Sequence, residues 1–73
     1  MAETSAEEWI ESFAAAVGGE PPDEELIGKL LKLAAVAAHS SERIAAPIAC
    51  WIAGSGGVDV DRAIEAAESL GDG

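Results

Sequence analysis

The sequence predicts an all-α protein: a small four-helix bundle forming a single domain over residues 1–73, with an ordered core of about residues 5–70. Apolar side chains recur at helical spacing, whereas tyrosine is absent and β-branched residues rarely alternate with polar ones as strands require. Apolar residues make up 49% of the chain but aromatic residues only 4%, because much of the apolar share is alanine. Alanine favours helix but buries little area, so we expect a thin core that depends on few large side chains.

The first helix is expected over residues 6–17. Ser5 and Glu8 have the spacing of a capping box at its start, and Gly18 is the natural residue to end it. The Gly-Glu-Pro-Pro sequence at 19–22 then predicts a stiff connector, because proline restricts its own backbone and that of the residue before it. We expect a buried apolar stripe along this helix, with its tryptophan as a core anchor: Trp9, Ile10, Phe13 and Val17.

The second helix is the longest, from Asp23 or Glu24 to Ala38 or His39. Asp23 is placed to cap it, and Lys29 lies four residues after an acid, Glu25, which is the favourable orientation for an ion pair. Two neighbouring apolar seams make one wide face for the core: Leu26, Leu30, Leu33 and Ala37, followed by Ile27, Leu31, Ala34 and Ala38.

The third helix is predicted to be short and apolar and to start near Pro47. If Pro47 is its first residue, the helix covers residues 47–53 and residues 41–46 form a turn or 3₁₀ segment. If Pro47 is interior, it kinks one helix that begins at Glu42. The first alternative or a mixture is favoured, because an interior proline costs about 3 kcal/mol. The side chains expected to face the core are Ile48, Trp51 and Ile52, before a flexible connector at 54–57.

The fourth helix is expected from about Val60 to Leu70. Asp59 is its predicted N-cap and Gly71 its end. Its apolar face comprises Val60, Ile64, Ala67 and Leu70.

The ten residues 44–53 contain no charge, although the whole chain has a formal net charge of -10. This stretch is too short to cross a bilayer, which takes about 20 residues. We therefore expect it to be a central helix wrapped by the others, or to carry a face that a partner covers. The acidic surface repels phosphate backbones and anionic lipids, so neither nucleic acid nor membrane is expected as a partner.

The sequence predicts no catalytic, cofactor-binding or metal-binding residue. His39 is the only histidine and has no ligand partner three or four residues away, so it is expected as a surface or capping residue. Cys50 is the only cysteine and is expected as a small buried side chain. A single cysteine and an acidic start without an apolar signal segment predict a reduced, cytoplasmic location.

Four stretches together resemble a small helical domain of unknown function that is common in actinobacteria. They are Glu8-Trp9-Ile10, the Gly-Glu-Pro-Pro connector, the Leu/Ala segment ending in Ala38-His39, and the segment from Glu42 through Pro47 to Gly54. That domain also occurs as a C-terminal appendage of the guanylyltransferase that attaches GMP to the molybdenum cofactor. Because this chain lacks the α/β nucleotide-binding part of the transferase, the resemblance implies an accessory module and not the enzyme.

Two functional hypotheses follow. The first is a non-catalytic interaction module for a protein partner, which the resemblance implies is a molybdenum-cofactor enzyme. Its candidate partner-binding residues are His39, Arg43 and Pro47, since helix propensity and core packing explain them least. The second is a self-associating homodimer, because so small a core leaves a surplus of apolar surface at residues 26–38 and 44–53. An enzymatic function is not expected.

Overall fold

A computed structural model describes residues 5–72, and these residues form four α-helices and no strand. The helices are α1 (Ala6–Val17), α2 (Glu24–Ser40), α3 (Ala45–Ser55) and α4 (Val60–Asp72). The prediction of a small all-α fold is confirmed. The single domain over residues 1–73 stays a prediction, and residues 1–4 and 73 lie outside the described part of the chain.

Helix α1 begins and ends where short-range hydrogen bonds place it. The Glu8 N–H donates to Ser5 Oγ over 3.1 Å, and the Ser5 N–H donates to Glu8 Oε1 over 3.2 Å, which completes the capping box. Gly18 has φ 77°, a left-handed conformation that costs glycine little, and the Gly19 N–H donates to the Ala14 carbonyl over 2.8 Å. Both predicted ends are confirmed.

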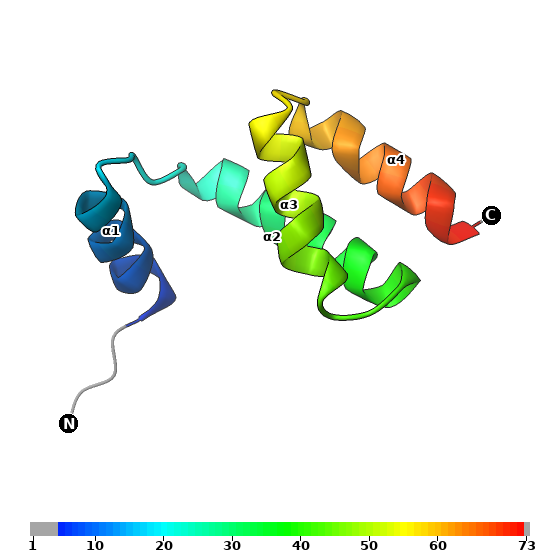
Figure 1. Ribbon diagram of the computed structural model, residues 1–73, viewed down its shortest axis with the longest axis horizontal. Helices are drawn as coiled ribbons and strands as arrows, with labels where there is room; N and C mark the ends of the chain where they lie inside the picture. The colour runs from blue at the N-terminus through cyan, green and yellow to red at the C-terminus, as the bar shows by residue number, and fades with distance from the viewer. Residues whose placement is uncertain (1–4, 73) are drawn as a thin grey trace.

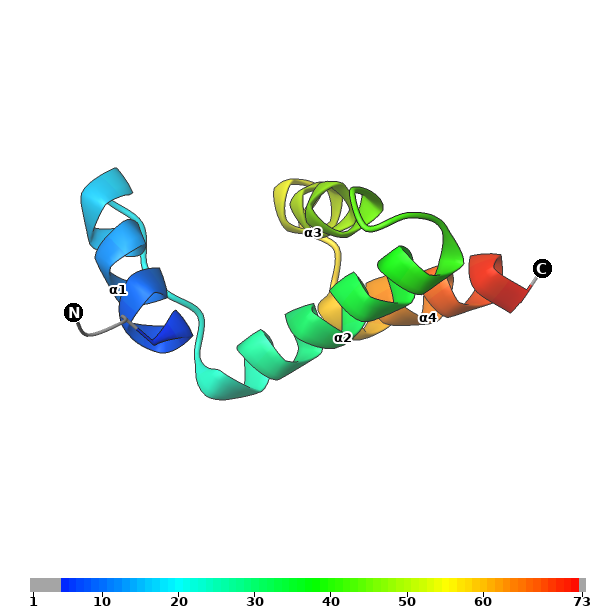
Figure 2. The same cartoon turned by 90° about the horizontal axis from the view of Figure 1, so that it is seen from below.

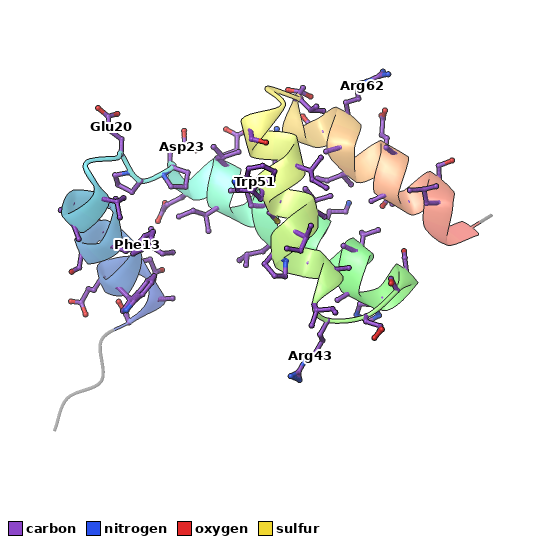
Figure 3. The ribbon with its side chains drawn as sticks, viewed as in Figure 1. Phe13, Glu20, Asp23, Arg43, Trp51 and Arg62 are labelled. Carbon is purple, nitrogen blue, oxygen red and sulfur yellow. The ribbon has the colours of Figure 1, made fainter. Side chains whose placement is uncertain are left out.

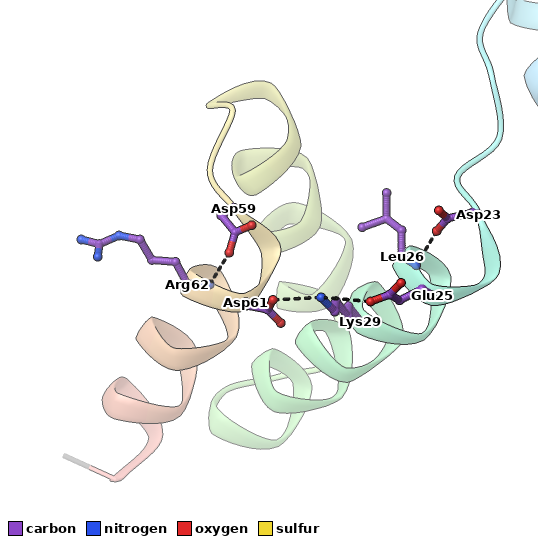
Figure 4. Close-up of polar contacts among 7 residues, drawn as sticks. All are labelled: Asp23, Glu25, Leu26, Lys29, Asp59, Asp61 and Arg62. Atoms are coloured by element: carbon purple, nitrogen blue, oxygen red, sulfur yellow. Dashed lines mark hydrogen bonds and ion pairs between the residues drawn. The ribbon is translucent and has the colours of Figure 1, made fainter.

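Helix α2 begins after Asp23, whose Oδ1 accepts the Leu26 N–H over 2.8 Å, so the predicted cap is confirmed (Figure 4). The helix runs to Ser40, slightly beyond the expected end at Ala38 or His39. Its last carbonyls still find partners there, because the Ser41 N–H donates to the Ala37 carbonyl over 3.1 Å.

Helix α3 begins at Ala45, which makes Pro47 its third residue. The helix therefore starts near Pro47, as predicted, but Pro47 is not its first residue and the helix does not run from Glu42. A turn precedes it, as expected for residues 41–46, because the Ala45 N–H donates to the Glu42 carbonyl over 2.9 Å and the Ala46 N–H donates to the Arg43 carbonyl over 3.1 Å. The first turn of a helix has no intrahelical partner for its N–H groups, so a proline there removes no hydrogen bond. The helix also extends to Ser55 and takes in part of the expected 54–57 connector.

The core lies where α2, α3 and α4 meet, and its centre is one buried residue from each helix: Leu33, Ala53 and Ile64. Helices α2 and α4 lie side by side, and α3 crosses above them as a second layer (Figure 1, Figure 2). Small side chains allow this close approach, since the half-buried residues around the centre include Cys50, Ala63 and Ala67. Cys50 is thus half-buried and not fully buried as expected.

An ion pair joins α2 to α4 at the edge of this core (Figure 4). Lys29 Nζ lies 2.9 Å from Asp61 Oδ2 and 3.7 Å from Glu25 Oε2. The pair with Glu25 was predicted, and the closer contact with Asp61 comes from the tertiary fold. The hydrogen bond to Asp61 is the main cause that raises the pKa of Lys29, with further help from the charges of both acids and Asp59.

Helix α1 stands apart from the other three helices (Figure 1). Among the described residues, it makes no Cα approach within 8 Å to α2, α3 or α4. The predicted buried stripe is therefore wrong: Trp9 is 57% exposed and Phe13 52%, and Val17 is exposed as well. The prediction that Trp9 is a core anchor is therefore wrong as well. At the other end of the chain, Leu70 of α4 is also exposed, and the helix continues past Gly71 to Asp72.

Candidate interaction surface

The outer side of α3 presents four large apolar side chains to solvent, which we call the α3 face: Ile44, Ile48, Trp51 and Ile52. Ile44 is 75% exposed and Trp51 is 70% exposed. The expectation that Ile48, Trp51 and Ile52 face the core is wrong, and so is that of a wrapped central helix. The residues of α3 that pack inward are small, and Ala53 is the buried one.

The packing of α3 on α2 explains why the large side chains point outward. The Cys50 thiol approaches the Leu30 carbonyl at 3.8 Å, a weak sulfur hydrogen bond that marks how closely the two backbones lie. A backbone approach of this kind leaves room for alanine and cysteine but not for tryptophan or isoleucine. Large side chains on α3 must therefore occupy the opposite side.

Two open grooves border the α3 face, and both are lined by Ala49 and Ile52. The first has a volume of about 290 Å³ and lies between α3 and α4, with Leu33, Val58 and Leu70 among its lining residues. The second has a volume of about 430 Å³ and lies at the start of α3, beside Ile44 and Ile48. A side chain that docks on the α3 face can thus enter an apolar depression on either side.

The charge around the α3 face is unusual for this acidic chain. Residues 43–58 contain no carboxylate, whereas residues 1–25 contain eight acids and no base. Arg43 precedes the face in sequence and makes no ion pair with any residue that the structure describes. Its side chain extends away from the ribbon into solvent (Figure 3). The α3 face therefore combines apolar area with one available positive charge.

A second apolar surface lies on α1, and we call Trp9, Phe13 and Val17 the α1 face. The Trp9 and Phe13 rings are stacked, with centroids 5.1 Å apart and an interplanar angle of 8°. All three side chains are exposed. The acids Glu7, Glu8 and Glu11 occupy other sides of the same helix. The α1 face is thus an aromatic stripe on an acidic amphipathic helix.

The three residues predicted from sequence, His39, Arg43 and Pro47, are all exposed around the α2–α3 corner. No hydrogen bond between described residues joins them to one another. Arg43 and Pro47 adjoin the α3 face in sequence, whereas His39 lines a different groove of about 630 Å³ with Val36, Glu68 and Gly71. The assignment of these three residues to partner binding stays a prediction.

Sequence reasoning assigned three residues of the α3 face, Ile48, Trp51 and Ile52, to the core, although it also placed surplus apolar surface in residues 44–53. The uncharged run was the available signal, and one of its two interpretations was a face for a partner to cover. Periodicity could not decide between them, because apolar residues lie on every side of this helix.

The described residues offer little for chemistry. They include no buried polar or charged side chain and no group of three or more His, Cys, Asp or Glu side chains arranged for a metal ion. In the same part of the chain, no helix is both long and apolar enough to cross a membrane. What the geometry supplies is apolar surface for contact.

Comparison with known families identifies a match. A family model described as a domain of unknown function (DUF6457) matches residues 1–72. The chain belongs to this family. No curated protein matches the chain, and no solved structure does. DUF6457 itself carries no assigned activity in its description, so any function must be argued from the surface described above.

Proposed function

We propose that this protein is a non-catalytic interaction module that receives an amphipathic helix of a protein partner on the α3 face. The exposure of Ile44, Ile48, Trp51 and Ile52 on one side of one helix is the observation that supports the proposal. Soluble monomers rarely leave a contiguous patch of this kind uncovered, and tryptophan is enriched in binding hot spots.

The chemistry of the partner follows from the surroundings of the face. Arg43 is available for a carboxylate, and residues 43–58 contain no acid, although Glu42 lines the groove beside Ile44 and Ile48. A partner helix with apolar residues three and four positions apart and acids at its edge fits this surface.

A narrower form of the proposal names the partner as a molybdenum-cofactor enzyme, the guanylyltransferase first, in the actinobacterial cytoplasm. It is supported by the resemblance of the four sequence stretches to the appendage of that transferase and by no contact in the fold. His39, Arg43 and Pro47 remain its proposed binding residues, of which Arg43 and Pro47 adjoin the α3 face in sequence.

The test is binding of the purified full-length chain to the guanylyltransferase of its source organism, followed by calorimetry. Ile48→Ser and Arg43→Ala are expected to weaken binding while the thermal unfolding midpoint stays unchanged. Arg62→Ala is the matched control, because Arg62 is an exposed arginine on α4, far from Arg43 (Figure 3). Wild-type binding that Ile48→Ser leaves intact would exclude the α3 face.

The broader proposal, that the α3 face binds some protein partner, is tested separately with a photo-reactive amino acid in living cells. Placed at residue 48, it is expected to cross-link a protein, and placed at residue 62 it is expected to cross-link none. If residue 48 forms no cross-linked product with any protein, the proposal is contradicted, whether or not the guanylyltransferase binds the purified chain.

A further inference from the structure

We infer that the helix received by the α3 face is α1 of a second copy of this chain, so that two copies exchange their α1 helices reciprocally. This inference rests on the proposed function, because it names the occupant of the same face. It joins the two large apolar surfaces of the molecule, neither of which the chain itself covers.

The first argument is the area that the chain leaves exposed. Its accessible surface is 5695 Å², whereas a compact monomer of 7.4 kDa exposes about 4,200 Å². A standard interface covers about 800 Å² on each partner. The excess of roughly 1,500 Å² is therefore large enough for a stable dimer, even when only part of it lies on the two faces.

The second argument is that α1 needs a partner. It has twelve residues and no contact with the other described helices. An isolated helix of this length is marginal in water, even with a good cap. Packing of its stacked Trp9 and Phe13 rings against apolar side chains would supply the tertiary contact that other helices of the chain obtain from the core.

The third argument is charge. Segment 1–25 is the most acidic part of the chain, with eight acids and no base. The α3 face lies in residues 43–58, one of two long stretches without a carboxylate, and has Arg43 at its start; the other such stretch is residues 26–41. The surface of α4 offers no such place, because that helix carries Asp61, Glu65 and Glu68 among its exposed residues. Charge therefore selects α3 over α4 as the place where α1 docks.

The fourth argument decides between the same chain and a second copy. The connector between α1 and α2 is fixed at both ends, by the Gly19 N–H bond to the Ala14 carbonyl and by the Asp23 cap. Only three residues lie between, and two of them are Pro21 and Pro22, whose φ is fixed. The two prolines favour an extended connector, so folding α1 back onto its own α3 would require a bend that this connector disfavours, whereas docking on a second copy requires none.

The reciprocal exchange of α1 helices produces a closed dimer. Each copy donates one α1 face and receives one on its α3 face, so the two contacts are related by a twofold axis and leave no unpaired surface for further growth. The expected assembly is a dimer and not a filament.

The test begins with sedimentation equilibrium of the full-length chain across the micromolar range. The wild type is expected to be dimeric. Phe13→Glu is expected to raise the dimer dissociation constant at least about thirtyfold, as loss of a hot spot does. Ser12→Glu is the matched control: it adds the same charge one residue away, outside the α1 face, and should leave the dimer intact. Neither variant touches the core, so circular dichroism should show both folded.

Cross-linking then identifies the contact. In a Cys50→Ala background, a Phe13→Cys chain mixed with an Ile48→Cys chain should form a mixed disulfide-linked dimer. A Ser12→Cys chain mixed with the same partner should form little. When Phe13→Cys and Ile48→Cys are combined in one chain, the product should be a covalent dimer. An internal disulfide within a monomer would instead show that α1 docks on its own α3 and would overturn the inference.

A wild-type monomer throughout the concentration range would also overturn the inference. So would dimerisation of Phe13→Glu as tight as that of Ser12→Glu. The proposed function would survive either result if Ile48→Ser still lost binding of a different protein, whereas both the proposed function and the inference would fail if residue 48 contacted no protein.

Discussion

Helices α1 and α4 have nearly the same length and the same kind of amphipathic pattern, yet only α4 packs. The residues of α4 that face α2 include Ala63, Ile64 and Ala67, which are small enough for two helices to approach closely. The stripe of α1 consists of large aromatic side chains, Trp9 and Phe13, and no described residue outside α1 and its connector comes close enough to receive them. The comparison shows that a helical apolar stripe predicts a helix but not what the helix packs against.

The connectors produce the second difference between the two helices. The α3–α4 connector contains Gly57 at φ 68°, a left-handed turn that lets the chain reverse and bring α4 back beside α2. The α1–α2 connector contains Pro21 and Pro22 instead, which favour an extended backbone. One connector returns its helix to the core, and the other holds its helix away from it.

The largest expected effect comes from Leu33, the most buried residue of the core at 2% exposure. Leu33→Ala should lower the free energy of unfolding by about 2–5 kcal/mol, because it leaves a cavity between α2, α3 and α4. The measurement is urea denaturation followed by circular dichroism. Leu31→Ala is the matched control, since Leu31 is on the same helix and 65% exposed, and it should change stability by less than about 0.5 kcal/mol. If Leu33→Ala and Leu31→Ala lowered the free energy of unfolding equally, the described core would be contradicted.

The two N-caps test whether α1 and α4 belong to different cooperative units. Asp59 Oδ2 accepts the Arg62 N–H over 3.3 Å at the start of α4, and Asp59→Ala should lower global stability by about 1 kcal/mol. Ser5→Ala removes the equivalent cap of α1 and should fray that helix alone in the monomer. Amide hydrogen exchange at low protein concentration distinguishes the two outcomes. Faster exchange of core amides after Ser5→Ala, or a global loss of stability equal to that of Asp59→Ala, would mean that α1 is part of the core.

A stabilising change is expected at Gly28, which lies inside α2 with no atom within 4 Å of the place that a Cβ would occupy. Gly28→Ala should raise the free energy of unfolding by about 0.5–1 kcal/mol, because alanine loses less backbone entropy in a helix. Gly18→Ala is the contrasting variant: its φ of 77° is strained for alanine, so it should shorten α1 and leave the core unchanged. Thermal unfolding monitored by circular dichroism measures both.

The smallest expected effect is the pH dependence that arises from Lys29. Its pKa is raised in the folded state, chiefly by the hydrogen bond to Asp61, so the stabilisation is fully present below the reference pKa of 10.5 and is lost as the pH rises above it. Lys29→Met should abolish this alkaline dependence, and added salt should weaken it in the wild type. Lys32→Met is the control, because Lys32 is exposed on the same helix and makes no ion pair among the described residues. If the Lys29→Met variant loses stability at alkaline pH just as the wild type does, the Lys29–Asp61 ion pair is not the cause of that loss.

The four helices and most of their ends could be predicted from the order of the residues alone. Ser5, Gly18 and Asp23 act through hydrogen bonds and backbone angles within a few residues, and such short-range interactions can be recognised from spacing alone. The start of α3 was harder, because a proline is tolerated throughout the first turn and not only at its first position. The predicted pair of Lys29 with Glu25 was local in the same sense, whereas its closer contact with Asp61 required the fold.

Which apolar side chains are buried depends on how the helices pack together. Hydrophobicity has no direction, so Trp51 and Leu33 looked alike as core residues, although one is 70% exposed and the other almost fully buried. The close approach of α3 to α2 admits only small side chains, and that approach depends on residues far apart in the sequence. The α3 face and the α1 face are the result: their helices follow from local patterns, whereas the packing of α2, α3 and α4 leaves their large side chains exposed.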